Sequence, residues 1–138
     1  MNTSAVNTMA NILMVSTLQK GLSPRPLYLN YELYTDGDAA FKGELSAMMI
    51  ENIQELRQSL HDAISQQQPD IFQKACHKTK VALHMLEDQE FTDTTEEIKS
   101  KLHHLDKTGN SFSEQIALFD ALSDAVIYSL ELEIKKDQ

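Results

Sequence analysis

The chain is poor in several residue types, and each shortage excludes a class of protein. It has one cysteine, Cys76, in 138 residues, which excludes an internal disulfide framework. It has only four glycines, and they form no Gly-rich phosphate loop, so no ATP-binding apparatus is visible. No apolar run approaches the ~20 residues of a membrane-spanning helix. Alternating apolar and polar runs between turn dipeptides, the pattern of strands, are also missing.

Positive charge is scarce as well. Twelve Lys and Arg residues against 21 Asp and Glu residues give a formal net charge of −9. This balance argues against a nucleic-acid-binding protein, whose affinity comes from neutralising phosphates. The apolar stretch 9–18 follows no positive segment and is interrupted by polar residues, so we do not interpret it as a signal peptide. We therefore expect a cytoplasmic protein that binds neither nucleic acid nor membrane.

Helical periodicity is abundant instead. Residues 1–27 are predicted to be an N-terminal extension or linker, either loose or with a short helix, and residues 28–138 a single domain. From Asp36 the spacing predicts a long helix, which Asp36 or Asp38 caps and which ends before Pro69. Its predicted core face consists of Phe41, Leu45, Met49, Ile53, Leu56, Leu60 and Ala63.

Two further helices are predicted after this one. The first covers about 69–88, with Pro69 as its first residue. A break over 89–92 follows. Asp93 and Glu96 then have the spacing of a capping box, which predicts that a shorter helix begins there. Its apolar face is Ile98, Leu102 and Leu105.

The last helix is predicted to follow a turn over 107–110, with Ser111 and Glu114 as its capping box. Four amphipathic helices with short connections predict an all-α fold, an antiparallel (up-and-down) four-helix bundle with an N-terminal extension. The predicted core residues of the last helix are Phe112, Ile116, Phe119, Val126, Ile127, Leu130 and Ile134.

The helix over 69–88 is the most informative. Because an α-helix advances ~100° per residue, each side chain can be placed around its axis. The apolar side holds Ile71, Ala75, Thr79, Ala82, Leu83 and Leu86, with Phe72 and Cys76 at its edge. The opposite side holds Gln73, His77, Lys80 and His84. His77 lies almost opposite the centre of the apolar side, so it is predicted to face solvent, whereas Cys76 is predicted to be a small packing residue.

This helix is also an island of positive charge. Lys74, Lys78 and Lys80 lie between Gln73 and Leu86 without an acidic residue among them. Such a surface suits an anionic ligand or an acidic pocket on a partner, although lysines that merely solvate a helix face are the simpler alternative. Imidazole has an unperturbed pKa of about 6.5, so near pH 7 its lone pair can attack an electrophilic phosphorus. Lys80, ~5–6 Å from His77 between Cβ atoms, can then compensate the phosphoryl charge.

Two stretches resemble histidine-containing phosphotransfer (HPt) domains, the carrier modules of multistep phosphorelays. Gly37-Asp38-Ala39-Ala40-Phe41, followed by Glu44-Leu45, is similar to the family's entry into its first long helix, where Gly-Asp precedes a buried Phe. Ala75, then His77-Lys78-Thr79-Lys80, is similar to the family's His, two residues, Lys signature. The resemblance spans about 28–105 and implies a bundle with the phosphorylated histidine exposed in mid-helix.

The resemblance also implies roles for individual residues. His77 would be the phosphoacceptor and Lys80 would stabilise the phosphoryl group. The partners would be response-regulator receiver domains or a hybrid sensor kinase, and the chain would be a monomeric phosphocarrier rather than a kinase. It would need no cofactor or metal of its own, because Mg²⁺ would belong to the receiver. The expected partner-binding residues are Gln73, Lys74, Lys78, Val81 and His84.

The sequence departs from the family at two positions. Val81 stands where the family usually has Gly after the lysine, only ~40° around the helix from His77. Our hypothesis is that this valine narrows access to His77. The alternative function is therefore a degenerate HPt-like bundle that docks receiver or kinase domains without carrying phosphate. Glu87 stands where a second glycine is common near the helix end, which predicts that the helix continues there without a bend.

Two other classes of protein fit the residues less well. A metal-binding bundle would use some of the five histidines, but di-iron bundles need inward-facing Glu-x-x-His pairs, and the chain has none. A purely structural interaction module would expose methionines, yet Met49 falls on the apolar face of its helix. Met48 and Ile50 lie off that face and remain available to cover a neighbouring element or a partner. The five histidines are His61, His77, His84, His103 and His104.

Overall fold

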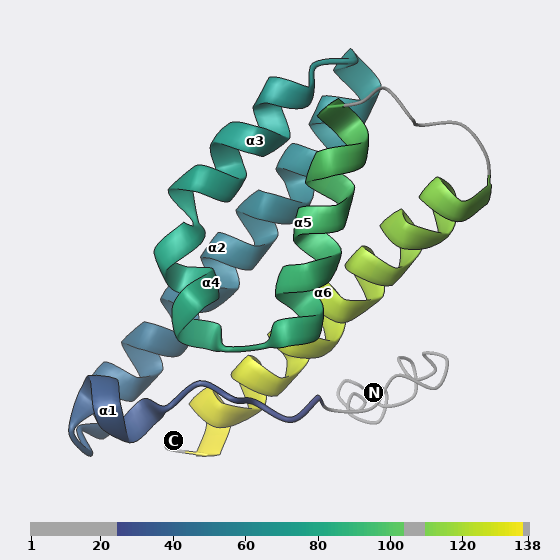
Figure 1. Ribbon diagram of the computed structural model, residues 1–138. Coiled ribbons are helices and arrows are strands. Elements are labelled where there is room, and N and C mark those ends of the chain that lie inside the picture. Colours follow the sequence, from purple (N-terminus) through teal and green to yellow (C-terminus); the bar gives the residue numbers. More distant parts are fainter. Residues whose placement is uncertain (1–24, 104–109, 137–138) are drawn as a thin grey trace, which may run out of the picture.

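The computed structural model describes residues 25–103 and 110–136, and over these ranges the protein is all-helical, without a strand, as predicted (Figure 1). α2 packs against α3 and α6, and α5 packs against α6 and α3, so these helices enclose one core. In the described ranges no helix is long and apolar enough to cross a membrane. The helices are α1 (Tyr31–Thr35), α2 (Ala39–Gln66), α3 (Pro69–Lys78), α4 (Lys80–Leu86), α5 (Gln89–His103) and α6 (Asn110–Lys136).

The long helix α2 begins as predicted. The Asp38 carboxylate accepts a hydrogen bond from the backbone N–H of Phe41 at 3.1 Å, which caps the helix. The predicted core face is buried from Leu45 to Ala63, but Phe41 is 46% exposed, so its predicted burial is wrong. The reason is helical drift: four-residue steps advance ~40° each, which leaves Phe41 roughly 70° from the middle of the buried face.

The short helix α1 was not predicted, because five residues are too few for a periodic pattern. The Asn30 side chain accepts a hydrogen bond from Leu33 N–H and caps it. Asp36 and Gly37 then adopt positive φ values of 52° and 81°, which turn the chain into α2. Gly37 of the Gly-Asp pair thus takes a backbone conformation that favours glycine.

The helix predicted over 69–88 differs from the structure at two points. It is interrupted at Thr79, whose φ of −94° and ψ of 7° separate α3 from α4. It also ends at Leu86, because Glu87 adopts the left-handed conformation with φ 55°, and its N–H bonds to the His84 carbonyl. The prediction that the helix continues through Glu87 is therefore wrong: a glutamate has taken the terminating conformation that glycine usually takes.

The predicted start of α5 is also wrong. The helix begins at Gln89, and the Asp88 carboxylate caps it by accepting from Phe91 N–H at 3.1 Å. Phe91 is fully buried, so packing against the core holds the first turn of α5 in place. The sequence pattern had predicted a break between helices at these residues. Asp93 lies inside α5 and is not a cap. Ile98 and Leu102 are buried as predicted, and Leu105 lies outside the described residues.

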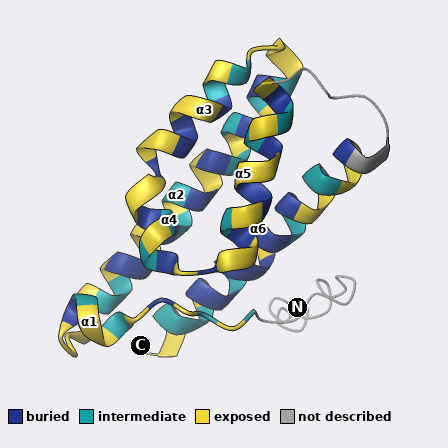
Figure 2. Ribbon diagram, viewed as in Figure 1, coloured by how far each residue is buried: buried dark blue, intermediate teal, exposed yellow. Residues whose placement is uncertain are grey.

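The core joins three helices through phenylalanines, and in Figure 2 the helices are coloured as buried and as exposed in alternating patches along their length. Phe119 of α6 stacks on Phe91 of α5 at 5.4 Å between ring centroids and meets Phe72 of α3 edge-on at 6.1 Å. The predicted core face of α6 is confirmed, except that Ile116 and Ile134 are only partly buried. The helix begins at Asn110, and the turn predicted before it lies mostly outside the described residues.

The described part of the N-terminal extension contacts the bundle. The backbone N–H of Arg25 donates to Ser129 Oγ of α6 at 2.8 Å, and Ser129 Oγ donates back to the Arg25 carbonyl at 2.7 Å. Leu27 packs against the hydrophobic core. Residues 1–24, with the predicted short helix, lie outside the described ranges, and the boundary between 27 and 28 stays a prediction.

Candidate functional site

All seven predicted site residues lie on α3 and α4 and are exposed. The opposite side of the same helical segment is buried at Phe72, Ala75, Cys76, Thr79, Ala82 and Leu86, while Ile71 and Leu83 are partly buried. The prediction that His77 lies opposite the core is therefore confirmed, and the roles of the site residues stay predictions. The seven are Gln73, Lys74, His77 and Lys78 of α3, and Lys80, Val81 and His84 of α4.

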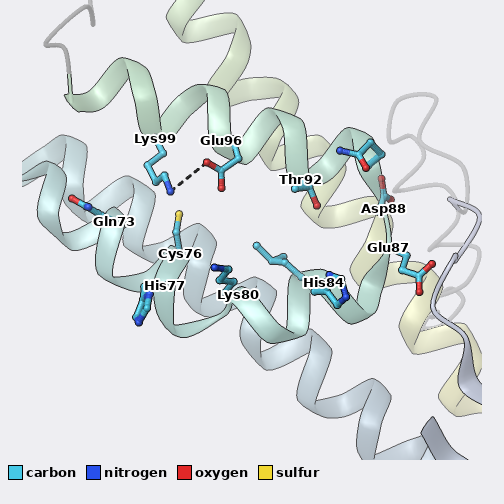
Figure 3. Close-up of a pocket in the computed structure, with 12 residues that line it drawn as sticks. Gln73, Cys76, His77, Lys80, His84, Glu87, Asp88, Thr92, Glu96 and Lys99 are labelled. Carbon is cyan, nitrogen blue, oxygen red and sulfur yellow. Dashed lines mark ion pairs between the residues drawn. The ribbon is translucent and has the colours of Figure 1, made fainter. Parts of the chain in front are cut away.

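A groove of about 900 Å³ runs between the α3–α4 segment and α5. Figure 3 shows Lys80 and His84 along one wall and Glu96 and Lys99 along the other, with the His77 ring at the rim, directed away from α5. His77 also borders a smaller hollow of about 450 Å³ on the α3 surface. A group bound to the His77 ring would therefore lie in open space at the edge of the groove.

The lysines of the island differ in their surroundings. Lys78 Nζ lies 2.8 Å from Glu55 Oε2 of α2, so its charge is partly neutralised within the chain. Lys74 and Lys80 form no ion pair within the described part of the chain. Of these three lysines, Lys80 is therefore the one that lines the groove and has no ion-pair partner in the described residues.

The opposite wall of the groove was missed by the sequence analysis. Glu96 and Lys99 of α5 face α3 and α4 and form an ion pair at 3.3 Å. Nothing in the local sequence of α5 distinguishes these two residues from a solvated helix face. Only the packing of α5 beside α3 brings them to the site.

A side-chain hydrogen bond also joins the two walls. Gln73 Oε1 lies 2.6 Å from His103 Nε2, so the imidazole N–H of α5 donates to the amide oxygen of α3. Gln73 was predicted to face a partner protein, and it already has a partner within the chain. Because Gln73 is one turn before His77, the bond fixes the distance between the helices next to the candidate phosphoacceptor.

Two of the described histidines are engaged by other side chains. His61 Nε2 pairs with Asp120 of α6 at 3.0 Å, and His103 is engaged by Gln73. No group of three or more His, Cys, Asp or Glu side chains that could hold a metal ion occurs among the residues that the structure describes. His104 lies outside them.

Cys76 lies in the floor of the groove, 7% exposed. Burial raises the pKa of its thiol to about 12, with a smaller opposing effect of Lys99. The thiol is therefore protonated near neutral pH and is a poor nucleophile. Cys76 is a packing residue, as predicted.

A buried ion pair fixes one end of the groove. Asp88 is 2% exposed and accepts from Arg25 Nε at 2.6 Å and Nη2 at 2.9 Å, while Glu90 accepts from Arg25 at 2.8 Å. Burial alone would raise the pKa of Asp88, but hydrogen bonds from Arg25 and from Phe91 N–H outweigh it and lower that pKa. The pair holds the α4–α5 connection in place. Because this connection joins the two walls of the groove, the pair also helps to set their separation.

Comparisons of the chain with protein-family models, with curated proteins and with solved structures give no significant match.

Proposed function

We propose that the protein is a phosphorelay carrier: His77 accepts a phosphoryl group from the aspartyl phosphate of one receiver domain and passes it to the aspartate of another. The observation that carries the proposal is the exposed imidazole opposite the core, at the rim of a groove, with a lysine three residues on that has no ion-pair partner among the described residues. This combination supplies a nucleophile, access for a partner and a positive charge on the consecutive helices α3 and α4.

The transfer is an in-line displacement at phosphorus. The lone pair of an imidazole nitrogen forms the N–P bond while the P–O bond to the aspartate breaks, and the electron pair leaves with the carboxylate. The reverse displacement, by the carboxylate of the next receiver, restores the free imidazole. The carrier supplies position and charge, and the receiver supplies its own acidic, Mg²⁺-binding pocket.

Charge explains how two acidic proteins could dock. The chain has a net charge of −9, yet Lys74 and Lys80 are exposed on either side of His77 without an acidic partner in the described residues. A local positive surface favours approach of an acidic receiver pocket and then stabilises the negative phosphoryl group during transfer.

The bundle would serve as a rigid support for this surface. In our proposal α2, α3 with α4, α5 and α6 are the four members of an antiparallel, up-and-down bundle, and the chain works as a cytoplasmic monomer. The helical packing of α2 with α3 and α6, and of α5 with both α3 and α6, supports that arrangement.

The test is incubation with a receiver domain phosphorylated by acetyl phosphate. The expected result is acid-labile, base-stable label on the chain that is lost in His77→Gln and kept in His84→Gln, a second exposed histidine of the same segment. We expect Lys80→Ala to retain labelling but slow transfer by about 10- to 100-fold, because it removes a charge that stabilises the transition state. Label that persists in His77→Gln would refute the proposal.

One observation favours a second function, docking without phosphate transfer. Val81 is 70% exposed on α4, four residues after His77, so an apolar side chain protrudes from the same helical segment as the imidazole. A receiver that binds the wild-type chain but transfers no label to His77 would support this alternative.

A further inference from the structure

The groove between the α3–α4 segment and α5 has the size of a small-molecule site and is braced at both ends. Its volume of about 900 Å³ falls among pockets that bind small ligands, roughly 300–1,000 Å³. The hydrogen bond between Gln73 and His103 joins the two walls at one end. The α4–α5 connection joins them at the other, where Arg25 pairs with Asp88. These contacts hold the walls apart, so the groove is preformed.

Two lysines from opposite walls extend into this groove. Figure 3 shows Lys80 of α4 and Lys99 of α5 directed into the space between the walls, toward the Cys76 side chain. Burial raises the pKa of the Cys76 thiol and the positive charge of Lys99 opposes that rise, so the Lys99 ammonium lies near the sulfur. The His77 ring is directed away from α5 and takes no part in this arrangement.

Most hydrogen-bond donors of these two ammonium groups are left for a ligand. An ammonium group carries three N–H donors and no acceptor. Lys99 is paired with Glu96 at 3.3 Å, whereas Lys80 forms no hydrogen bond or ion pair with any residue that the structure describes. The two lysines and Glu96 together leave one uncompensated positive charge in the groove.

The other two carboxylates of the lining do not cancel this charge. Glu87 points away from Lys80 and Lys99 in Figure 3. Asp88 is 2% exposed, and Arg25 already neutralises it through two hydrogen bonds. The middle of the groove therefore favours an anion, although the chain as a whole has a net charge of −9.

We propose that the groove binds a small phosphate monoester, with its anionic head between Lys80 and Lys99 and its organic part against Leu83. Such a group carries a charge of about −1.5 to −2 near pH 7 and three strong acceptor oxygens, which suits donors that approach from two walls. Leu83 supplies apolar surface in the lining, and a bare phosphate ion would fill little of the groove. This site does not use His77 and does not depend on the proposed phosphotransfer.

The test is titration of the ¹⁵N-labelled protein with phenyl phosphate, followed by backbone amide chemical shifts. Ionic strength is held constant, because salt screens exposed charges. We expect saturable shifts in residues 80–84 and 92–99 with a single dissociation constant. Inorganic phosphate, which lacks the organic part, and benzoate, which has a single charge, should bind more weakly. Shifts that do not saturate, or benzoate that binds as tightly as phenyl phosphate, would overturn the proposal.

Charge-changing variants locate the bound anion. Lys80→Ala and Lys99→Ala should each weaken binding of phenyl phosphate by about tenfold, because each removes charge-assisted hydrogen bonds. Glu96→Gln should tighten it by about two- to fivefold, because the competing carboxylate on Lys99 is gone. Thermal unfolding followed by circular dichroism confirms that each variant is folded.

Two control variants separate this site from the rest of the positive surface. Lys74→Ala removes an exposed lysine of the same helical segment that does not line the groove, and it should bind phenyl phosphate like wild type. His77→Gln should do the same, whatever the outcome of the phosphotransfer assay. Equal weakening in Lys74→Ala and Lys80→Ala would show that general surface charge holds the anion, and would contradict the proposed site.

Discussion

At the scale of single residues, Val81 is the departure from the HPt pattern that bears most on the proposed function. Its exposure of 70% means that the side chain is not required by the core. A β-branched residue on an exposed helix face also has no advantage for helix stability over alanine. The valine is therefore available to control access to His77, one helical turn away.

We predict that Val81→Gly and Val81→Ala both accelerate transfer from a phosphorylated receiver to His77, because each removes apolar bulk beside the imidazole. Glycine should also lower the free energy of unfolding by up to about 1 kcal/mol, whereas alanine should not lower it. Single-turnover transfer rates and urea unfolding measure the two effects separately. Equal rates in wild type and both variants would show that Val81 does not restrict access.

At the scale of elements, the connection between α4 and α5 depends on contacts distant in sequence. Glu87 terminates α4 in a left-handed conformation, and Asp88 caps α5 while pairing with Arg25, 63 residues earlier. Local patterns pointed to Asp93 and Glu96, since a capping box can occur by chance inside a helix. The true start of α5 was not predictable locally because the ion pair and the burial of Phe91 select it.

We predict that Asp88→Asn lowers the free energy of unfolding by about 2 kcal/mol at pH 7, because it breaks a largely buried ion pair while asparagine can still cap α5. Asp88→Ala should cost about 1 kcal/mol more, since it also removes the cap. Glu90→Gln is the control: Glu90 is 55% exposed, and its pairing with Arg25 should contribute less than about 1 kcal/mol. Urea denaturation provides all three values.

The same variants have a defined pH dependence. The pKa of Asp88 is lowered in the folded protein, so its stabilisation is fully present above the unfolded pKa of about 4. It is lost as the pH falls through the lower, folded pKa. The stability difference between wild type and Asp88→Asn should therefore shrink below about pH 4. A difference that stays constant down to pH 2 would contradict this assignment.

At the scale of the whole molecule, one core supports the site. Phe119 links α6 to α5 and α3 through two ring contacts, so the helix that carries His77 is anchored to the centre of the bundle. Rigid support would serve the proposed transfer, because the transfer requires the imidazole and Lys80 to keep their relative positions.

We predict that Phe119→Ala lowers the free energy of unfolding by about 3–5 kcal/mol, through lost burial and a cavity among three helices. Its neighbour Leu118, which is 42% exposed, is the matched control, and Leu118→Ala should change stability by no more than about 0.5 kcal/mol. Far-ultraviolet circular dichroism and tyrosine fluorescence should report one coincident transition. Separate transitions for the two probes would show that the helices do not share a single cooperative core.

The sequence by itself determined the all-α class, most of the buried faces of α2 and α6, and the exposure of His77 and its six companions. These features follow from the spacing of apolar residues, which reports burial directly once a segment is helical. Phe41 is the exception among these residues. Its four-residue spacing places it on the apolar face, but the rotation that accumulates over successive four-residue steps moves it away from the buried side chains.

Only the tertiary structure decided where the helices begin and end. It also decided which residues of other helices lie opposite the site on α3 and α4. The cap at Asp88 is paired with Arg25, 63 residues earlier, and the second wall with Glu96 and Lys99 comes from the packing of α5 beside α3. Periodicity describes one helix at a time, and these features arise where two helices meet. His77 was therefore predictable as an exposed histidine, whereas the groove beside it, and the direction of Lys80 within it, were not.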